Sequence, residues 1–199
     1  MIAPIPDPPV ITPEQAAEIE ANKSKIVNGR ECGACALCCK VLDVPQLDAP
    51  AGQWCRFNVP GKGCGTYPTR PLICRGFYCE WMVAKGLGDE WKPDRCKFVL
   101  VKSAATRSMR AHVDPGNPTA WKKSPYYENF KIWAAEGLRQ SPEMHIVYAM
   151  IGLRVVVILP DRDEDIGVVS LNERIWLDRV NGPGGLEIKV RRAAREAVV

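Results

Sequence analysis

The sequence is short of long apolar runs, histidine and excess charge. None of its 199 residues belongs to an apolar stretch of about 18 residues, so the sequence predicts no membrane-spanning helix. A formal net charge of +4 falls short of the basic surface typical of nucleic-acid-binding proteins and does not favour that class of partner. Neither of the glycine-rich nucleotide-binding motifs is present, which argues against a dinucleotide or P-loop site.

The first residues also lack the features of a secretory signal. Residues 1–9 have neither a basic start nor an apolar segment, and four of them are proline. This composition predicts a disordered, proline-rich arm over residues 1–11. It also favours a cytoplasmic location, where thiols are kept reduced.

Cysteine, by contrast, is abundant and confined to one region. All nine cysteines lie between Cys32 and Cys96. A single cysteine often serves as a small buried apolar residue, but nine within 65 residues exceed what packing requires. The odd number and the expected reducing compartment argue against a disulfide framework. Metal ligation is therefore the favoured interpretation.

The densest part of this region reads Cys32-Gly-Ala-Cys35-Ala-Leu-Cys38-Cys39. Each C-x-x-C step brings two thiolates close together on a tight turn, and the small intervening residues permit that turn. This spacing is typical of zinc and iron–sulfur sites. His112 and His145 have no ligand-like spacing and are expected to be structural or surface residues. An all-thiolate site excludes magnesium and calcium and favours zinc, iron–sulfur or copper(I).

The adjacent residues Cys38 and Cys39 bear on the number of centres, because neighbouring Cβ atoms diverge in many backbone conformations. One hypothesis is a centre built from Cys32, Cys35 and Cys38 with a distant fourth cysteine. Cys39 would then join ligands from a second group, formed by Cys55, Cys64, Cys74 and Cys79. A single larger iron–sulfur cluster with spare cysteines is the alternative, and the sequence does not decide between them.

The motif continues with Cys55 and then Cys64-x2-Tyr67-x2-Arg70-Pro71-x2-Cys74-Arg75. Together with Cys32–Cys39, this pattern resembles the CxxCxxCC cysteine-cluster family (YkgJ-like), which is described as zinc- or iron-chelating and includes relatives of the flagellin lysine N-methylases. The resemblance covers the cysteine-rich part and implies metal binding far more than catalysis. The expected ligands are Cys32, Cys35, Cys38, Cys39, Cys55, Cys64, Cys74 and Cys79, with Cys96 as an extra.

Several polar residues within the motif are expected to surround the ligands. Four thiolates around zinc carry a net charge of about −2, which nearby cations offset. Arg70, Arg75 and Lys40 are candidates for this role, and Tyr67 is expected to lie beside the site. Pro71 is expected to fix the turn that delivers Cys74.

The function predicted from these residues is a metal-binding protein that holds iron, as an iron–sulfur cluster, or zinc. The alternatives are an iron–sulfur-dependent enzyme, either an oxidoreductase or methyltransferase-like, and a zinc-stapled interaction module. No nucleophile–base pair or substrate-binding motif identifies a reaction. The acidic run over residues 161–165 lacks the glycine and the final glutamate of a calcium loop and is interpreted as a solvated turn.

The expected fold class is α+β: a cysteine-rich, loop-dominated metal-binding lobe joined to a mixed helix and antiparallel-strand lobe. The arm over 1–11 is followed by a helix and the cysteine lobe over 12–96, and the second lobe covers 97–199. Capping and apolar spacing predict helices over 13–24 and 125–139. Strands are expected over 97–102, 110–113, 145–150, 154–159, 174–180 and 186–190.

Overall fold

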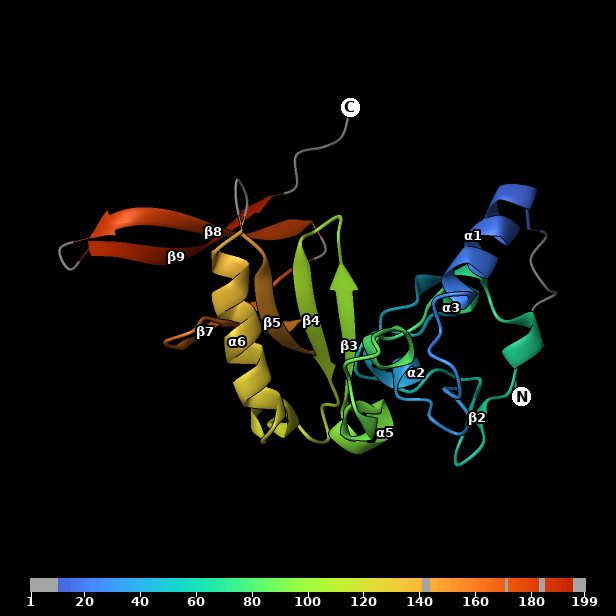
Figure 1. The fold of residues 1–199 in the computed structure, drawn as a ribbon. Helices are drawn as coiled ribbons and strands as arrows, with labels where there is room; N and C mark the ends of the chain where they lie inside the picture. The colour runs from blue at the N-terminus through green and yellow to red at the C-terminus, as the bar shows by residue number, and fades with distance from the viewer. Residues whose placement is uncertain (1–10, 141–143, 171, 183–184, 195–199) are drawn as a thin grey trace. The chain divides into compact units, whose positions relative to one another are not determined.

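The computed structural model describes residues 11–140, 144–170, 172–182 and 185–194 (Figure 1). The chain divides into two compact units. The first unit comprises residues 1–100 and 114–117, and the second comprises 101–113 and 118–199. Most of the arm expected over residues 1–11 lies outside the described residues.

The first unit opens with helix α1 (Pro13–Lys23), which confirms the predicted helix and its start. The Thr12 hydroxyl accepts from the Gln15 N–H at 3.3 Å, and the Gln15 side chain accepts from the Thr12 N–H at 3.0 Å. Every later element within this unit has at most four residues. These are α2 (Cys38–Val41), η1 (Pro45–Leu47), β1 (Asn58–Val59), β2 (Gly63–Cys64), η2 (Tyr67–Thr69), α3 (Leu72–Arg75), α4 (Glu80–Val83), η3 (Asp89–Trp91) and α5 (Pro93–Cys96).

Strand β3 (Phe98–Ser103) begins in the first unit and ends in the second. It is the first strand of a five-stranded sheet of order β3-β4-β5-β6-β7. The other strands are β4 (Ser108–Val113), β5 (Ile146–Ile151), β6 (Arg154–Ile158) and β7 (Asp163–Val168). The remaining elements are η4 (Ala120–Lys122), α6 (Tyr126–Leu138), β8 (Glu173–Gly182) and β9 (Gly185–Ala194).

The sheet is mixed, whereas the sequence had led us to expect antiparallel strands. β4 and β5 pair in parallel, with Ala111 opposite Ala149, while β5–β6 and β6–β7 are antiparallel. Helix α6 lies between β4 and β5 in the chain. A parallel pair requires such a crossover connection, which explains the difference. The α+β class and helix α6 are confirmed.

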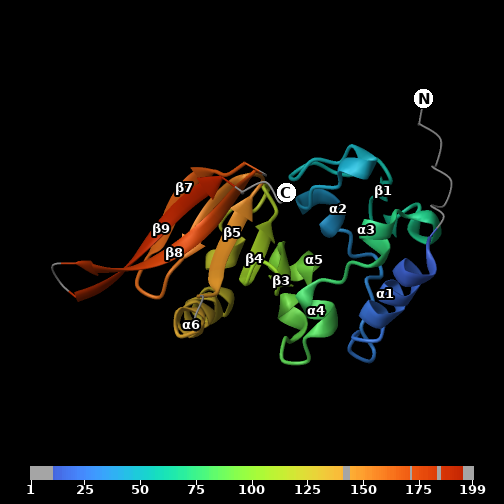
Figure 2. The same cartoon turned by 90° about the horizontal axis from the view of Figure 1, so that it is seen from above.

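Helix α6 and the β8–β9 hairpin cover opposite faces of this sheet (Figure 2). Val155 and Val157 point to one face and pack against a group of residues of the hairpin. Asp163 pairs with Ile158, so its side chain lies on the other face, where Lys131 of α6 contacts it at 2.8 Å. The hairpin residues packed on the sheet are Ile175, Leu177, Ile188 and Val190.

Two details of the second unit correct the sequence interpretation. The acidic run expected to be a solvated turn instead enters β7, because Lys131 and the Tyr127 hydroxyl hold Asp163 at 2.8 and 3.0 Å. The two strands of the hairpin are also longer than predicted. No helix in the described part of the chain has the length and apolar character needed to cross a membrane.

Candidate metal centre

A cavity of about 140 Å³ in the first unit brings the cysteines together. Eight of the nine line it, and we call it the cysteine cavity: Cys32, Cys35, Cys38, Cys39, Cys55, Cys64, Cys74 and Cys79. These are the eight residues predicted as ligands. They come from separate loops and short helices between α1 and β3, so the fold of this unit gathers them from 48 residues of chain.

Tight turns present the first cysteines of the motif. The Cys35 N–H donates to the Cys32 carbonyl at 2.9 Å, and the Cys39 N–H donates to the Ala36 carbonyl at 2.9 Å. A Cβ atom on Gly63, whose φ is +94°, would lie only 3.1 Å from the Gly33 oxygen. Glycine is therefore required where the β1–β2 hairpin approaches the Cys32–Cys35 loop. This close approach places Cys64, the next residue, beside that loop.

A second set of contacts joins the later cysteines to Cys39. The Cys55 N–H donates to the Cys39 carbonyl at 2.7 Å. Cys39 and Cys74 both pack against the apolar cluster that contains Cys55 and Phe57. In the hairpin, Asn58 pairs with Cys64. Backbone bonding and burial thus link Cys55 and Cys74 to Cys39, and the hairpin links Cys64 to the Cys55 segment.

Backbone N–H groups are directed at several of the sulfur atoms. Burial raises the pKa of Cys35, Cys55 and Cys79, that of Cys79 to about 11. The opposing influence is hydrogen bonding, since main-chain N–H groups donate to each of these three sulfurs and lower its pKa. The donors are Leu37 and Asp94 for Cys35, Phe57 for Cys55, and Met82 and Trp81 for Cys79. Such bonds favour the thiolate, the form that binds metal.

Cys38 and Cys39 form a hydrogen-bonded thiol pair. The bond from Cys38 lowers the pKa of Cys39 to about 7 despite its burial, and the positive charge of Arg70 acts in the same direction. Cys38, as the donor, has its pKa raised, and burial raises it further. Cys39 is therefore the thiol of this pair that ionises first.

Arg70 and Asp43 are the charged residues among those that line the cysteine cavity. The Arg70 guanidinium stacks on the Tyr67 ring, with 3.6 Å from Cζ to the ring centroid. Its Nε donates to the Cys74 carbonyl at 3.0 Å, which fixes the group beside the sulfurs. Tyr67 also makes a side-chain hydrogen bond to Cys32 that lowers the pKa of that thiol, although burial raises it more.

The other predicted cations have different partners. Arg75 donates to the carbonyls of Arg70 and Pro68, both at 2.9 Å, and thereby holds the turn before α3. Lys40 forms an ion pair with Asp114 at 2.6 Å. Neither Arg75 nor Lys40 lines the cysteine cavity. Their sequence positions suggested a place beside the sulfurs, but their side chains serve the loops instead.

Cys96 and the histidines also lie outside the cavity lining. The Cys96 sulfur is 3.1 Å from the Phe98 carbonyl oxygen and 3.4 Å from that of Trp91. Burial raises the pKa of Cys96 to about 12, so it is a protonated thiol that donates to the backbone. His112 belongs to the second unit, where burial lowers its pKa to about 4.

The sequence did not identify most of the apolar wall of the cavity or the acidic residue in it. Apolar side chains line the cavity together with the sulfurs, and Asp43 follows Cys39 closely in the chain. The apolar members of the wall are Ala36, Val44, Leu47, Ile73, Phe77, Trp81, Met82, Pro93 and Val99.

The donor chemistry of the cavity fits a thiophilic metal. Trp81, which lines it, has a buried Nε1–H with no acceptor among the residues that the structure describes, and a metal-bound thiolate would supply one. Within the same residues, no three His, Cys, Asp or Glu side chains form a ready ligand set for one ion. Zinc bonds sulfur at about 2.3 Å, so metal binding requires the thiol side chains to turn inward.

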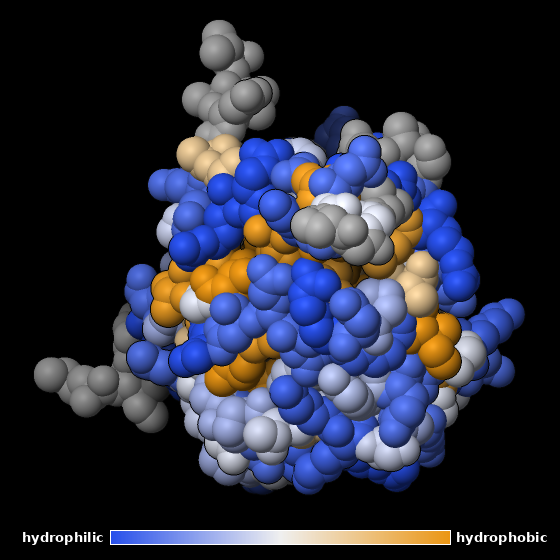
Figure 3. Space-filling view, turned by 90° about the vertical axis from the view of Figure 1, so that its left-hand side faces the viewer, coloured by the Kyte–Doolittle hydropathy of each residue, from blue (hydrophilic) through white to orange (hydrophobic). Residues whose placement is uncertain are grey.

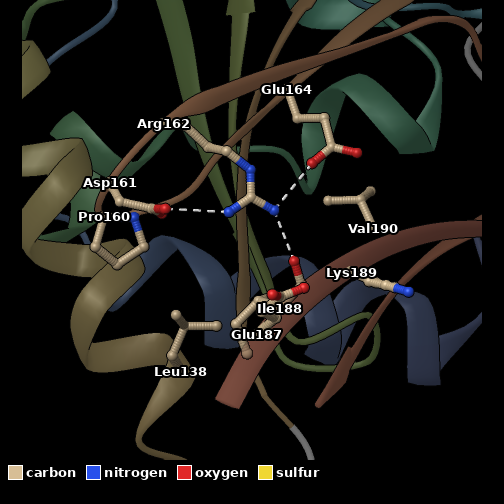
Figure 4. A pocket seen from close by; sticks show the side chains of 9 residues that line it. All are labelled: Leu138, Pro160, Asp161, Arg162, Glu164, Glu187, Ile188, Lys189 and Val190. Carbon is tan, nitrogen blue, oxygen red and sulfur yellow. Dashed lines mark hydrogen bonds and ion pairs between the residues drawn. The ribbon is translucent and has the colours of Figure 1, made fainter. Parts of the chain in front are cut away.

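The second unit contains a more open pocket of about 810 Å³ (Figure 4). Arg162 lies across it and donates to Asp161 at 3.1 Å, Glu164 at 3.2 Å and the Ile188 carbonyl at 2.6 Å. This charge is therefore satisfied within the protein, and Arg162 ties β9 to the turn before β7. The face drawn in Figure 3 is mostly hydrophilic, with hydrophobic patches between the polar side chains.

Comparison of the chain with protein-family models, curated proteins and solved structures found no match. The resemblance to the CxxCxxCC family therefore stays an expectation that rests on the motif.

Proposed function

We propose that this protein binds iron, as an iron–sulfur cluster, or zinc through cysteine thiolates, as members of the CxxCxxCC family are expected to do. The observation that carries the proposal is that eight cysteines from separate segments line one cavity of about 140 Å³. Soft thiolate donors select zinc, iron–sulfur clusters or copper(I) over hard cations.

The surroundings of the sulfurs support the same function. Hydrogen bonds from main-chain N–H groups lower the pKa of Cys35, Cys55 and Cys79, and the Arg70 charge lowers that of Cys39. Both features stabilise anionic sulfur, as the environment of a metal–thiolate centre must. All nine cysteines are free thiols in this structure, which suits ligation in a reducing compartment. We accordingly propose a cytoplasmic location.

The test is the metal and acid-labile sulfide content of protein purified without oxygen, together with its absorption spectrum. Iron with sulfide and broad visible charge-transfer absorption supports an iron–sulfur protein and the enzymatic alternative. Colourless protein with stoichiometric zinc supports a structural or binding role.

Two single variants supply the matched comparison. Cys55→Ser removes a cavity thiol and is expected to lower the metal content, whereas Cys96→Ser removes the thiol outside the cavity lining and is expected to leave it unchanged. Protein that contains no metal and has paired cysteines would contradict the proposal.

A further inference from the structure

We propose that the eight cavity cysteines form two adjoining four-thiolate centres, each of which holds its own thiophilic metal ion or cluster. The first centre consists of Cys32, Cys35, Cys38 and Cys79. The second consists of Cys39, Cys55, Cys64 and Cys74. This inference rests on the proposed function and adds to it the number of centres and the ligands of each.

Helix α2 separates the two sets. Cys38 and Cys39 are its first two residues, and consecutive residues of an α-helix project about 100° apart around the axis. Each side chain therefore reaches toward a different part of the cavity wall. Both residues line the same cavity, so the two centres are neighbours.

The first set is assembled by the Cys32–Cys35 turn and the start of α4. The Cys35 N–H donates to the Cys32 carbonyl at 2.9 Å, so both sulfurs leave one tight turn. Cys79 precedes α4, and Arg30, two residues before Cys32, donates to the Trp81 and Ala84 carbonyls, which holds the start of α4 beside this turn. Cys38 follows Cys35 at the next C-x-x-C step. The structure thus places Cys79 in the first set, whereas the sequence hypothesis had grouped it with the second.

The second set is assembled around Cys39. The Cys55 N–H donates to the Cys39 carbonyl at 2.7 Å, and Cys74 packs with Cys39 against the cluster that contains Cys55. The Asn58 N–H donates to the Cys55 carbonyl at 2.9 Å, and Asn58 pairs with Cys64 across the β1–β2 hairpin, which brings Cys64 to Cys55. With Cys79 in the first set, each set contains four thiols, the number that tetrahedral zinc and four-iron clusters require.

The position of the Arg70 guanidinium fits the negative charge that two tetrathiolate centres would carry. Two zinc–tetrathiolate centres together carry a charge of about −4, twice that of one centre. Arg70 interacts with Cys32 of the first set and with Cys39 and Cys74 of the second. Its guanidinium is held by the Tyr67 and Cys74 carbonyls, both at 3.0 Å. This cation therefore offsets the charge of both centres from one position.

The experiment measures how many equivalents of zinc(II) and cobalt(II) bind to the reduced full-length protein without oxygen. Cobalt(II) reports tetrathiolate coordination by its absorption spectrum. We expect two equivalents for the parent protein. Cys79→Ser and Cys74→Ser are each expected to weaken one equivalent by at least tenfold and to leave the other unchanged.

Two double variants separate the centres. Cys35→Ser/Cys79→Ser removes two ligands from the same set and is expected to retain one equivalent at the parent affinity, whereas Cys74→Ser/Cys79→Ser removes one from each set and is expected to weaken both equivalents by at least tenfold. Native mass spectrometry of the same variants, isolated from metal-supplemented cells, avoids any failure of the metal-free forms to refold. Cys96→Ser is the control and is expected to bind two equivalents.

The outcomes distinguish this inference from the proposed function. A parent protein that binds no metal overturns both. A parent that binds a single equivalent or cluster, or a within-set double variant that loses all metal, overturns the two-centre assignment and leaves metal binding intact.

Discussion

The two units of this chain are stabilised in different ways. The second has strands of five to ten residues, a 13-residue helix and fully buried side chains such as Phe130 and Val157. After α1, the first unit has no element longer than four residues until β3 begins. Regular elements satisfy their own backbone and bury a continuous apolar face, whereas short turns do neither well.

The first unit compensates with arginine side chains bonded to main-chain carbonyls. Arg30 donates to the carbonyls of Trp81, Ala84 and Leu87, and its guanidinium also lies over the Trp81 ring. Arg75 likewise donates to two main-chain carbonyls of the turn before α3. A planar guanidinium with five donors suits this role, because one side chain can fix several carbonyls at once. The comparison indicates that the first unit relies on individual contacts between side chains and main-chain carbonyls. Metal–thiolate bonds would be the strongest contacts of this unit.

Metal removal should produce the largest difference between the units. A chelator applied under reducing conditions is expected to abolish amide-exchange protection over residues 32–79, because structural zinc contributes on the order of 10 kcal/mol to folding. Protection of β4, β5 and β6 should persist, because apolar side chains of this sheet are buried against the β8–β9 hairpin and need no metal. Exchange measured by mass spectrometry tests both units in one sample. Unchanged protection over 32–79 would mean that the cysteines do not stabilise the first unit.

Truncation of the apolar core should affect the second unit instead. Phe130 is 0% exposed, and Phe130→Ala is expected to lower the free energy of unfolding of this unit by about 3–5 kcal/mol. Ile132, on the same helix, is 54% exposed, and Ile132→Ala should change that free energy by less than about 0.5 kcal/mol. Denaturant-dependent amide exchange of β5 gives both values. A fall in metal content in Phe130→Ala would break the comparison, because it would show that the two units unfold together.

Acid should also destabilise the second unit, through His112. Burial, assisted by the charge of Arg110, lowers the pKa of this imidazole from 6.5 to about 4, so the folded state holds it neutral. Its contribution to stability is present above pH 6.5 and is lost as the pH falls toward 4. The difference amounts to roughly 2–3 kcal/mol near pH 4.5.

His112→Gln removes this titration. The loss of stability of β4 and β5 between pH 7 and pH 4.5 should therefore be smaller in the variant than in the parent protein. Carboxylates titrate in both proteins, and the subtraction cancels them. Equal losses in the two proteins would show that His112 is not held neutral by the fold.

The parts of the fold that follow local rules were predictable from the sequence. The Thr12-Pro13 start and Gln15 located α1, and apolar spacing located α6. The identity of β7 was not predictable, because Asp163 is drawn into the sheet by Lys131, which lies 32 residues away. The parallel pairing of β4 with β5 likewise depends on where α6 packs, which no local pattern encodes.

The candidate site divides in the same way. The C-x-x-C spacing indicated the cysteines of the Cys32–Cys39 segment, because such turns are local structures, and the resemblance to the CxxCxxCC family indicated Cys55, Cys64, Cys74 and Cys79. The approach of α4 to the Cys32–Cys35 turn arises from the tertiary contacts of Arg30 with the Trp81 and Ala84 carbonyls, and the sequence had grouped Cys79 differently. Arg70 and Arg75 are also alike in the motif, yet only Arg70 lines the cavity. The motif predicts which thiols line the cavity, but not which of them are neighbours in the folded protein.

The smallest expected effect concerns Arg162, which ties the β8–β9 hairpin to the turn before β7. Its side chain is 42% exposed, as are its partners in large part, so Arg162→Gln should cost the second unit no more than about 1 kcal/mol. Its bond to the Ile188 carbonyl is the link to the hairpin, and the loss should therefore appear as faster amide exchange in β8 and β9 than in β5. Arg30→Gln, which leaves three carbonyls of the first unit without their donor, should cost that unit more. Equal losses in the free energy of unfolding for the two variants would contradict the comparison. They would mean that arginine–carbonyl hydrogen bonds stabilise the first unit no more than they stabilise a surface hairpin held mainly by apolar packing.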